Sequence, residues 1–223
     1  MPLATPLRLR VEPASDGPRL ELFDDHTVLV SGGVTGVRAE GAIEPGAAPP
    51  ADTSPVDDAM ALPISAGCFA CGLDNPLGLA AILRADDSAV GGTWTPRPGF
   101  RLADGTLAPV ALTTLLDEAA FWLGALASGE SGMTTELRVT LHESAPADGP
   151  ITVIGLRRAV RSRTADPRYW DTAVAARDAA GRLVASAAIT FVAVRGAARR
   201  LVTGMLAVNA PDLLRRVFPG YVR

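Results

Sequence analysis

One long apolar stretch among short alternating segments constrains the fold of this chain more than any other feature. Residues 109–127, PVALTTLLDEAAFWLGALA, contain good helix formers throughout and carry apolar side chains on more than one face. Pro109 suits the first position of a helix, where its missing N–H has no partner to lose, and Gly129 suits the helix end. We therefore expect one helix here, buried on more than one side.

Segments with the alternation of β-strands lie on both sides of this helix. Residues 77–85 and 89–96 predict a hairpin across the turn DDS. TTELRVTLH follows the helix, and its alternate apolar residues share one face: Leu137, Val139 and Leu141. Three further strand segments follow, at residues 151–163, 169–178 and 183–194.

An early apolar helix in a run of antiparallel strands predicts an α+β fold, in which a curled sheet encloses the helix. Because the helix is apolar on more than one side, we expect a second copy of the protein to cover what the sheet leaves open.

The composition of the sequence divides the chain into four parts. Residues 1–44 hold alternating segments (LRLRV, RLELF and HTVLV) broken by DGP and SGG, and predict a β-rich N-terminal extension. Residues 45–64 are rich in Pro and Ala and predict a linker, whereas residues 65–195 contain the α+β domain. Residues 196–223 predict a tail with a short helix around 211–217. A degenerate second unit of the same fold is an alternative for the N-terminal strands, but they lack a helix, which favours an added sheet or wrap.

Composition and charge exclude several classes of protein. The 223 residues are 48% hydrophobic, as in a globular protein, and a net charge of −3 provides no basic field to attract nucleic acid. No run of eighteen consecutive apolar residues occurs, and the N-terminus lacks the pattern of a signal peptide. The two cysteines cannot form a disulfide framework. We therefore expect a cytoplasmic protein with no nucleic-acid or membrane partner.

Four strings of the α+β domain occur in a specific order and spacing. They are CFACGLDNPLGL (68–79), GTLAPVALTTLLDEA (105–119), SGMTTELRVTLHESAPADGPITVIG (131–155) and DAAGRLVASAAITFV (178–192). Together they resemble the hotdog-fold acyl-CoA thioesterase superfamily, and PaaI-like thioesterases in particular. The resemblance implies a hotdog fold, a curled antiparallel β-sheet wrapped around a long central helix, here with an extra β-rich N-terminal segment. It also implies hydrolysis of acyl-CoA or acyl-carrier-protein thioesters, without a cofactor, by a homodimer or dimer of dimers.

The resemblance implies catalytic roles for Asp117, Thr134 and Val110. Asp117 matches the carboxylate that acts as general base or nucleophile, together with the helix start of the partner subunit. Its alternative is a solvated polar residue on a helix flank, although apolar neighbours on both sides in LLDEAAFW make simple exposure less common. Thr134 matches a hydroxyl residue that orients water, but strand propensity explains a Thr-Thr pair equally well.

The helix start departs from the family pattern. Many members carry His-Gly-Gly where this sequence has Ala108, Pro109 and Val110. A helix N-terminus offers free N–H groups and partial positive charge to a developing oxyanion. Since Pro109 has no N–H, Val110 is the expected donor.

Other polar residues are candidates for substrate binding. Glu118 points about 100° away from Asp117 around the helix, and is either an acting group or a surface or interface charge. Arg157 and Arg161 belong to the densest positive patch, with Arg158, Arg163 and Arg168. Guanidinium groups suit the phosphates of CoA, and a solvated sheet edge is the alternative.

The two cysteines, Cys68 and Cys71, form a single Cys-x-x-Cys pair. With no second pair and only two distant histidines, the sequence favours no metal site.

Related functions on the same scaffold are weaker hypotheses. A dehydratase needs an Asp–His pair near the helix start, and no histidine lies between His26 and His142. A DNA-binding acyl sensor needs a helix pair, whereas the N-terminal residues are strand-like. The main alternative is a non-catalytic hotdog domain that binds acyl thioesters or a partner protein, because the Gly-Gly pair is replaced.

Overall fold

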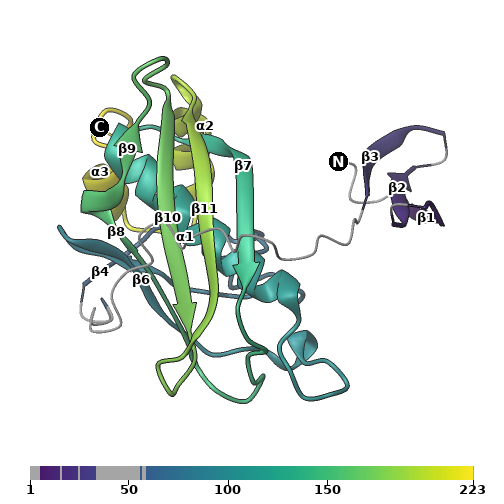
Figure 1. The fold of residues 1–223 in the computed structure, drawn as a ribbon. Coiled ribbons are helices and arrows are strands. Elements are labelled where there is room, and N and C mark those ends of the chain that lie inside the picture. Colours follow the sequence, from purple (N-terminus) through teal and green to yellow (C-terminus); the bar gives the residue numbers. More distant parts are fainter. Residues whose placement is uncertain (1–5, 16, 25, 34–55, 57–58, 223) are drawn as a thin grey trace. The chain divides into compact units, whose positions relative to one another are not determined.

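The computed structural model describes residues 6–15, 17–24, 26–33, 56 and 59–222, which fall into two compact units, residues 1–44 and 45–223. The first unit is an antiparallel meander (Figure 1) of β1 (Arg8–Glu12), β2 (Arg19–Phe23) and β3 (Val28–Gly33). Strands are therefore present where alternation predicts them. Most of the predicted linker at residues 45–64 lies outside the described residues.

The second unit is built on an eight-stranded sheet. Its strands are β4 (Met60–Ala61), β5 (Arg84–Ala85), β6 (Ala89–Trp94), β7 (Gly132–Leu141), β8 (Ile151–Leu156), β9 (Arg161–Ser162), β10 (Tyr169–Arg177) and β11 (Leu183–Ala193). The order is β4-β5-β6-β8-β10-β11-β7, with β9 paired to β10, and all pairs are antiparallel. Short 3-10 turns lie at Pro98–Phe100 and Arg157–Ala159.

Helix α1 (Pro109–Ser128) packs against β6, β7, β8, β10 and β11, and the curved sheet lies along it (Figure 1). It begins with Pro109 in its first turn and ends at Gly129, which is left-handed with φ 69° and donates its N–H to the Ala125 carbonyl. Leu115, Leu116 and eight other helix residues are buried. Each buried leucine contributes about 1.5–3 kcal/mol to stability. The α+β prediction is confirmed, and the architecture is the hotdog fold that the resemblance implies.

Two glycines allow α1 to lie close to the sheet. A Cβ on Gly124 would come within 2.4 Å of the Phe191 ring, and one on Gly155 within 2.5 Å of Leu123. By length and composition α1 could cross a membrane. Thr113, Thr114 and other polar residues interrupt the helix, so it contains no continuous apolar run of eighteen residues. Burial against the sheet accounts for its apolar composition.

The segment before β6 differs from the predicted hairpin. Only Arg84–Ala85 of the expected strand at 77–85 pairs with β6. The N–H groups of Leu79 and Ala81 instead donate to the carbonyls of Phe69 and Ala70, at 2.7 and 2.9 Å. This pairing anchors the segment that carries Cys68 and Cys71 to the domain.

The C-terminal residues contribute two helices to the core. Helix α3 (Pro211–Val217) matches the predicted short helix, whereas α2 (Ala197–Met205) was not predicted. Phe218, directly after α3, is fully buried with its ring 6.3 Å from that of Trp122 on α1. The prediction that a second copy covers the open side of α1 is therefore incomplete, because the chain's own tail covers part of it.

Candidate active site

A pocket of about 290 Å³ lies beside the middle of α1. The Cys-x-x-Cys segment, α1, β7 and α2 all contribute to it. Its lining residues are Ser65, Cys68, Cys71, Asp117, Glu118, Phe121, Trp122, Met133, Thr134, Leu201 and Met205. The pocket therefore brings together three predicted site residues, Asp117, Glu118 and Thr134, with the two cysteines.

Asp117 is held by a hydroxyl group from β7. Thr134 Oγ1 donates a hydrogen bond of 2.6 Å to Asp117 Oδ1. The register of β7 against β11 shifts at this point: Phe191 faces Thr134 and Thr190 faces Glu136, which leaves Thr135 as an extra residue. Such a bulge redirects side chains, and here the two threonines separate, because Thr135 donates instead to the Thr190 carbonyl.

Glu118 also lies in the pocket, half-buried. Trp122 Nε1, one helical turn further on, donates to Glu118 Oε1 at 2.9 Å. Burial, assisted by the negative charge of Cys68, raises the pKa of Glu118 to about 7. The role of a surface charge does not fit this position. The Glu-x-x-x-Trp spacing, about one helical turn, is the sequence signal for this contact.

Cys68 and Cys71 face Glu118 across the pocket. The two Sγ atoms and a Glu118 carboxylate oxygen all lie within 4.8 Å of one another. A hydrogen bond from the Cys71 thiol lowers the pKa of Cys68 to about 5, and the same bond raises the pKa of Cys71. These three groups could together hold a metal ion. Glu118 lies about fifty positions after the cysteines in the sequence, so no local motif could reveal the cluster.

Val110 lies in the first turn of α1 and is 54% exposed. At 1.5 Å per residue, its N–H is about 10 Å along the helix axis from Asp117. One chain therefore does not place both groups on the same thioester. A separate pocket of about 360 Å³ adjoins the helix start, lined by Pro109, Leu112 and His142 among others.

The arginine patch separates into individual contacts. Arg157 donates to the Asp86 carbonyl at 2.8 Å and lines another pocket, of about 470 Å³, while Arg161 donates to the carbonyls of Val160 and Arg158. Neither lines the Asp117 pocket, so their contact with CoA phosphates stays a prediction.

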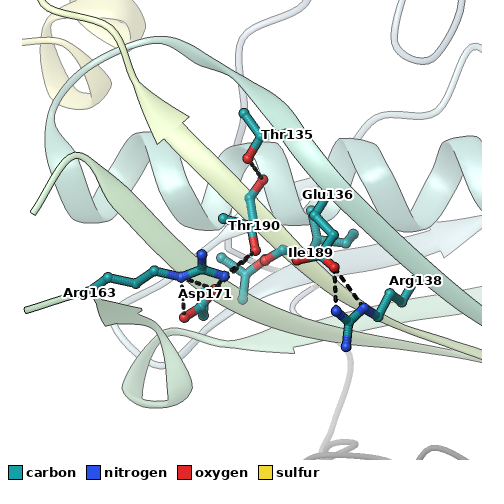
Figure 2. Close-up of polar contacts among 8 residues, drawn as sticks. Thr135, Glu136, Arg138, Arg163, Asp171, Ile189 and Thr190 are labelled. Carbon is teal, nitrogen blue, oxygen red and sulfur yellow. Dashed lines mark hydrogen bonds and ion pairs between the residues drawn. The ribbon is translucent and has the colours of Figure 1, made fainter. Parts of the chain in front are cut away.

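Arg163 and Arg168 have carboxylate partners. Figure 2 shows Arg163 bound to both Asp171 and Thr190, with Thr190 Oγ1 donating to Asp171 at 3.0 Å. Arg168 pairs with Asp166. These bonds make Arg163 and Arg168 parts of the sheet's polar surface.

The site is a carboxylate on the central helix of a hotdog domain, held by a strand hydroxyl in a mixed pocket. No protein-family model matches this sequence, and no curated protein is significantly similar to it.

Several solved structures are similar to this chain. A thioesterase superfamily protein is 26% identical, with 57% of this chain and 60% of that chain covered and a TM-score of 0.45, so the match spans less than two thirds of that protein. The PaaI protein of E. coli, from its phenylacetic acid degradation operon, is 14% identical, with 49% and 75% covered and a TM-score of 0.43. A hypothetical thioesterase with coenzyme A from Streptococcus pneumoniae is 19% identical, with 50% and 82% covered and a TM-score of 0.43.

Proposed function

We propose that this protein hydrolyses acyl thioesters of CoA or of an acyl-carrier protein. One observation carries the proposal. The Asp117 carboxylate accepts a hydrogen bond from Thr134 and lies in a pocket beside the central helix that is also lined by apolar side chains. A carboxylate in this position takes a proton from water, whose oxygen attacks the thioester carbonyl carbon. The C–S bond then breaks, and the leaving thiolate takes up the proton. Direct attack by Asp117, through an acyl-enzyme anhydride that water hydrolyses, is the other form of the same reaction.

The oxyanion of this reaction needs N–H donors that lie outside the Asp117 pocket of the same chain. We infer that Val110 of the partner subunit supplies one, because the two groups are about 10 Å apart within one helix. Strand β7 is the end strand of the sheet, and Met133, Leu137 and Leu141 are exposed on it. Pairing of two copies along β7 covers these side chains and forms a symmetric dimer.

A non-catalytic thioester-binding domain is the second candidate, and one observation favours it. Pro109 occupies the first turn of α1, where many members of the family that the sequence resembles carry glycine. The proline removes one N–H from the helix start, which leaves fewer donors for an oxyanion.

Thiol release from short, medium, long-chain and aryl acyl-CoAs separates the two candidates. We expect turnover by the wild-type chain and its loss in Asp117→Asn and Asp117→Ala, with the fold and oligomer unchanged. Asp212→Asn, an exposed carboxylate paired with Arg215 on α3, is the matched control and should retain turnover. Acyl-CoA binding without thiol release from any of these proteins would exclude hydrolysis and leave the binding domain.

A further inference from the structure

Cys68, Cys71 and Glu118 form a three-donor cluster that thioester hydrolysis does not require. Their ligand atoms lie within 4.8 Å of one another, and all three residues line the same pocket. We propose that these residues bind one Zn²⁺ ion, with its fourth coordination position open to the pocket of Asp117 and Thr134. The sequence alone argued against a metal because it showed only two donors close together. The fold adds the third from α1.

Backbone hydrogen bonds fix the loop that carries the two cysteines. The Cys68 N–H donates to the Ser65 carbonyl at 3.0 Å, and the Phe69 and Ala70 carbonyls, between the two cysteines, accept from Leu79 and Ala81. Hydrogen bonds around the ligands hold a metal site in one geometry.

The turn closes on Gly72. Its N–H donates to the Cys68 carbonyl at 3.0 Å, and a Cβ there would lie 2.4 Å from the carbonyl oxygens of Ala66 and Cys68. Only glycine permits this close approach, which brings the two sulfur atoms to one side of the loop.

The third donor is oriented by a neighbour on its own helix. Trp122 Nε1 holds Glu118 Oε1 at 2.9 Å. A hydrogen bond from an outer residue to one carboxylate oxygen is the usual way in which a ligating carboxylate is fixed. Trp122 is buried, so the carboxylate cannot turn away from the cysteines without breaking this bond inside the protein.

The charges of the pocket favour a cation. Two carboxyl groups and two thiols line it, and none of the described lining residues is basic. Bringing such groups together away from water is costly unless positive charge is present. A divalent ion supplies that charge, because it turns both thiols into thiolates and binds the carboxylate.

The donor set selects the metal and its coordination. Two soft thiolates favour Zn²⁺ over Mg²⁺ or Ca²⁺, which prefer oxygen ligands alone. Zinc is almost always four-coordinate in proteins, and three protein ligands leave one position for water or a small ligand. That position faces the Asp117 pocket. The proposal does not depend on hydrolysis, because zinc content is measured without substrate.

The test uses the full chain, purified under reducing conditions, stripped with a chelator and then titrated with Zn²⁺. After desalting we expect one zinc ion per chain, measured by inductively coupled plasma mass spectrometry. We also expect the two thiols to lose their reactivity toward a thiol reagent when zinc binds. With Co²⁺ in place of zinc, we expect intense tetrahedral d–d absorption and a thiolate-to-cobalt charge-transfer band. Fully reduced protein that takes up no stoichiometric zinc and gives no charge-transfer band would overturn the proposal, whether or not it forms a Cys68–Cys71 disulfide in air.

Variants then test the ligand assignment. Cys68→Ser and Cys71→Ser should each abolish stoichiometric binding. Glu118→Gln should weaken zinc binding by at least about tenfold, since even outer residues of zinc sites contribute that much. Asp117→Asn is the matched neighbouring change and should keep the zinc. If Asp117→Asn loses zinc and Glu118→Gln keeps it, the assignment of Glu118 is wrong. Circular dichroism checks the fold of each variant. If a variant fails to fold, the Co²⁺ spectrum of the wild-type chain still shows whether thiolates bind the metal.

Discussion

Thr134 on β7 donates a hydrogen bond of 2.6 Å to Asp117 on α1, across a bulge that sends the neighbouring Thr135 to a different acceptor. The bond connects the edge strand of the sheet to the proposed catalytic carboxylate. A hydrogen bond to a charged group contributes about 1.5–3 kcal/mol, so its loss should be visible in turnover.

Thr134→Val removes this bond with little change of shape. We expect kcat to fall by about 10- to 100-fold, which corresponds to the free energy of one bond to a carboxylate. KM should change little, because Thr134 positions Asp117 or water and is not proposed to hold the acyl chain. Thr134→Ser should restore most of kcat. Thr135→Val is the control, and a loss there equal to that of Thr134→Val would argue for a purely structural effect of the strand.

Pro109→Ala restores an N–H at the helix start. Because one oxyanion donor contributes about 100- to 1000-fold to kcat in hydrolases, we expect at least a tenfold rise in kcat toward acyl-CoA. Alanine is a good helix former, so the melting temperature should be nearly unchanged. Steady-state kinetics over the acyl-CoA panel makes the measurement. Unchanged kcat in a folded Pro109→Ala variant would show that the proline does not limit the oxyanion site.

Gly124→Ala tests how closely α1 approaches the sheet. A Cβ at Gly124 would lie 2.4 Å from the Phe191 ring, and overpacking of this kind costs about 1–3 kcal/mol. We expect a lower free energy of unfolding in urea. Gly204→Ala, on α2 where a Cβ meets nothing within 4 Å, should instead stabilise the protein by about 0.5–1 kcal/mol. A Gly124→Ala variant as stable as wild type would contradict the packing described for α1.

Asp178, in the turn between β10 and β11, makes stability depend on pH. Burial raises its pKa, but hydrogen bonds from Arg182 and the Ala180 N–H outweigh burial and lower the pKa below its usual range. Arg182 also contacts Glu143 at 3.4 Å.

A lowered carboxyl pKa contributes stability that is present above the pKa of the unfolded chain and is lost as pH falls through the folded value. We therefore expect Asp178→Asn to cost about 1–3 kcal/mol in urea unfolding at pH 7. This difference from wild type should shrink as pH falls below about 4. A difference that is the same at pH 7 and at pH 3 would show that the carboxylate charge does not matter.

Local patterns were sufficient for α1, α3 and most strands after α1, although the segment predicted as one strand at 151–163 divides into β8, a 3-10 turn and β9. Pro109 and Gly129 mark the ends of α1 through preferences of single residues in the first turn and at the C-cap, and these depend little on the rest of the chain. The resemblance could single out Asp117 as a candidate because the motif that carries it is contiguous, and its catalytic role stays a prediction.

The tertiary structure alone decided which residues share the pocket with Asp117. Cys68 and Cys71 meet Glu118 because residues 79–81, where the sequence predicted a regular strand, instead donate hydrogen bonds to the two residues between the cysteines. Helix α2 places Met205 in the same pocket, although its sequence resembles a solvated tail. Helix ends and strand alternation arise from interactions between near neighbours, which a sequence displays directly. A cluster of possible metal ligands from distant segments arises from tertiary packing. Local preferences allow many contacts between such segments, and the burial of apolar side chains determines which of them form.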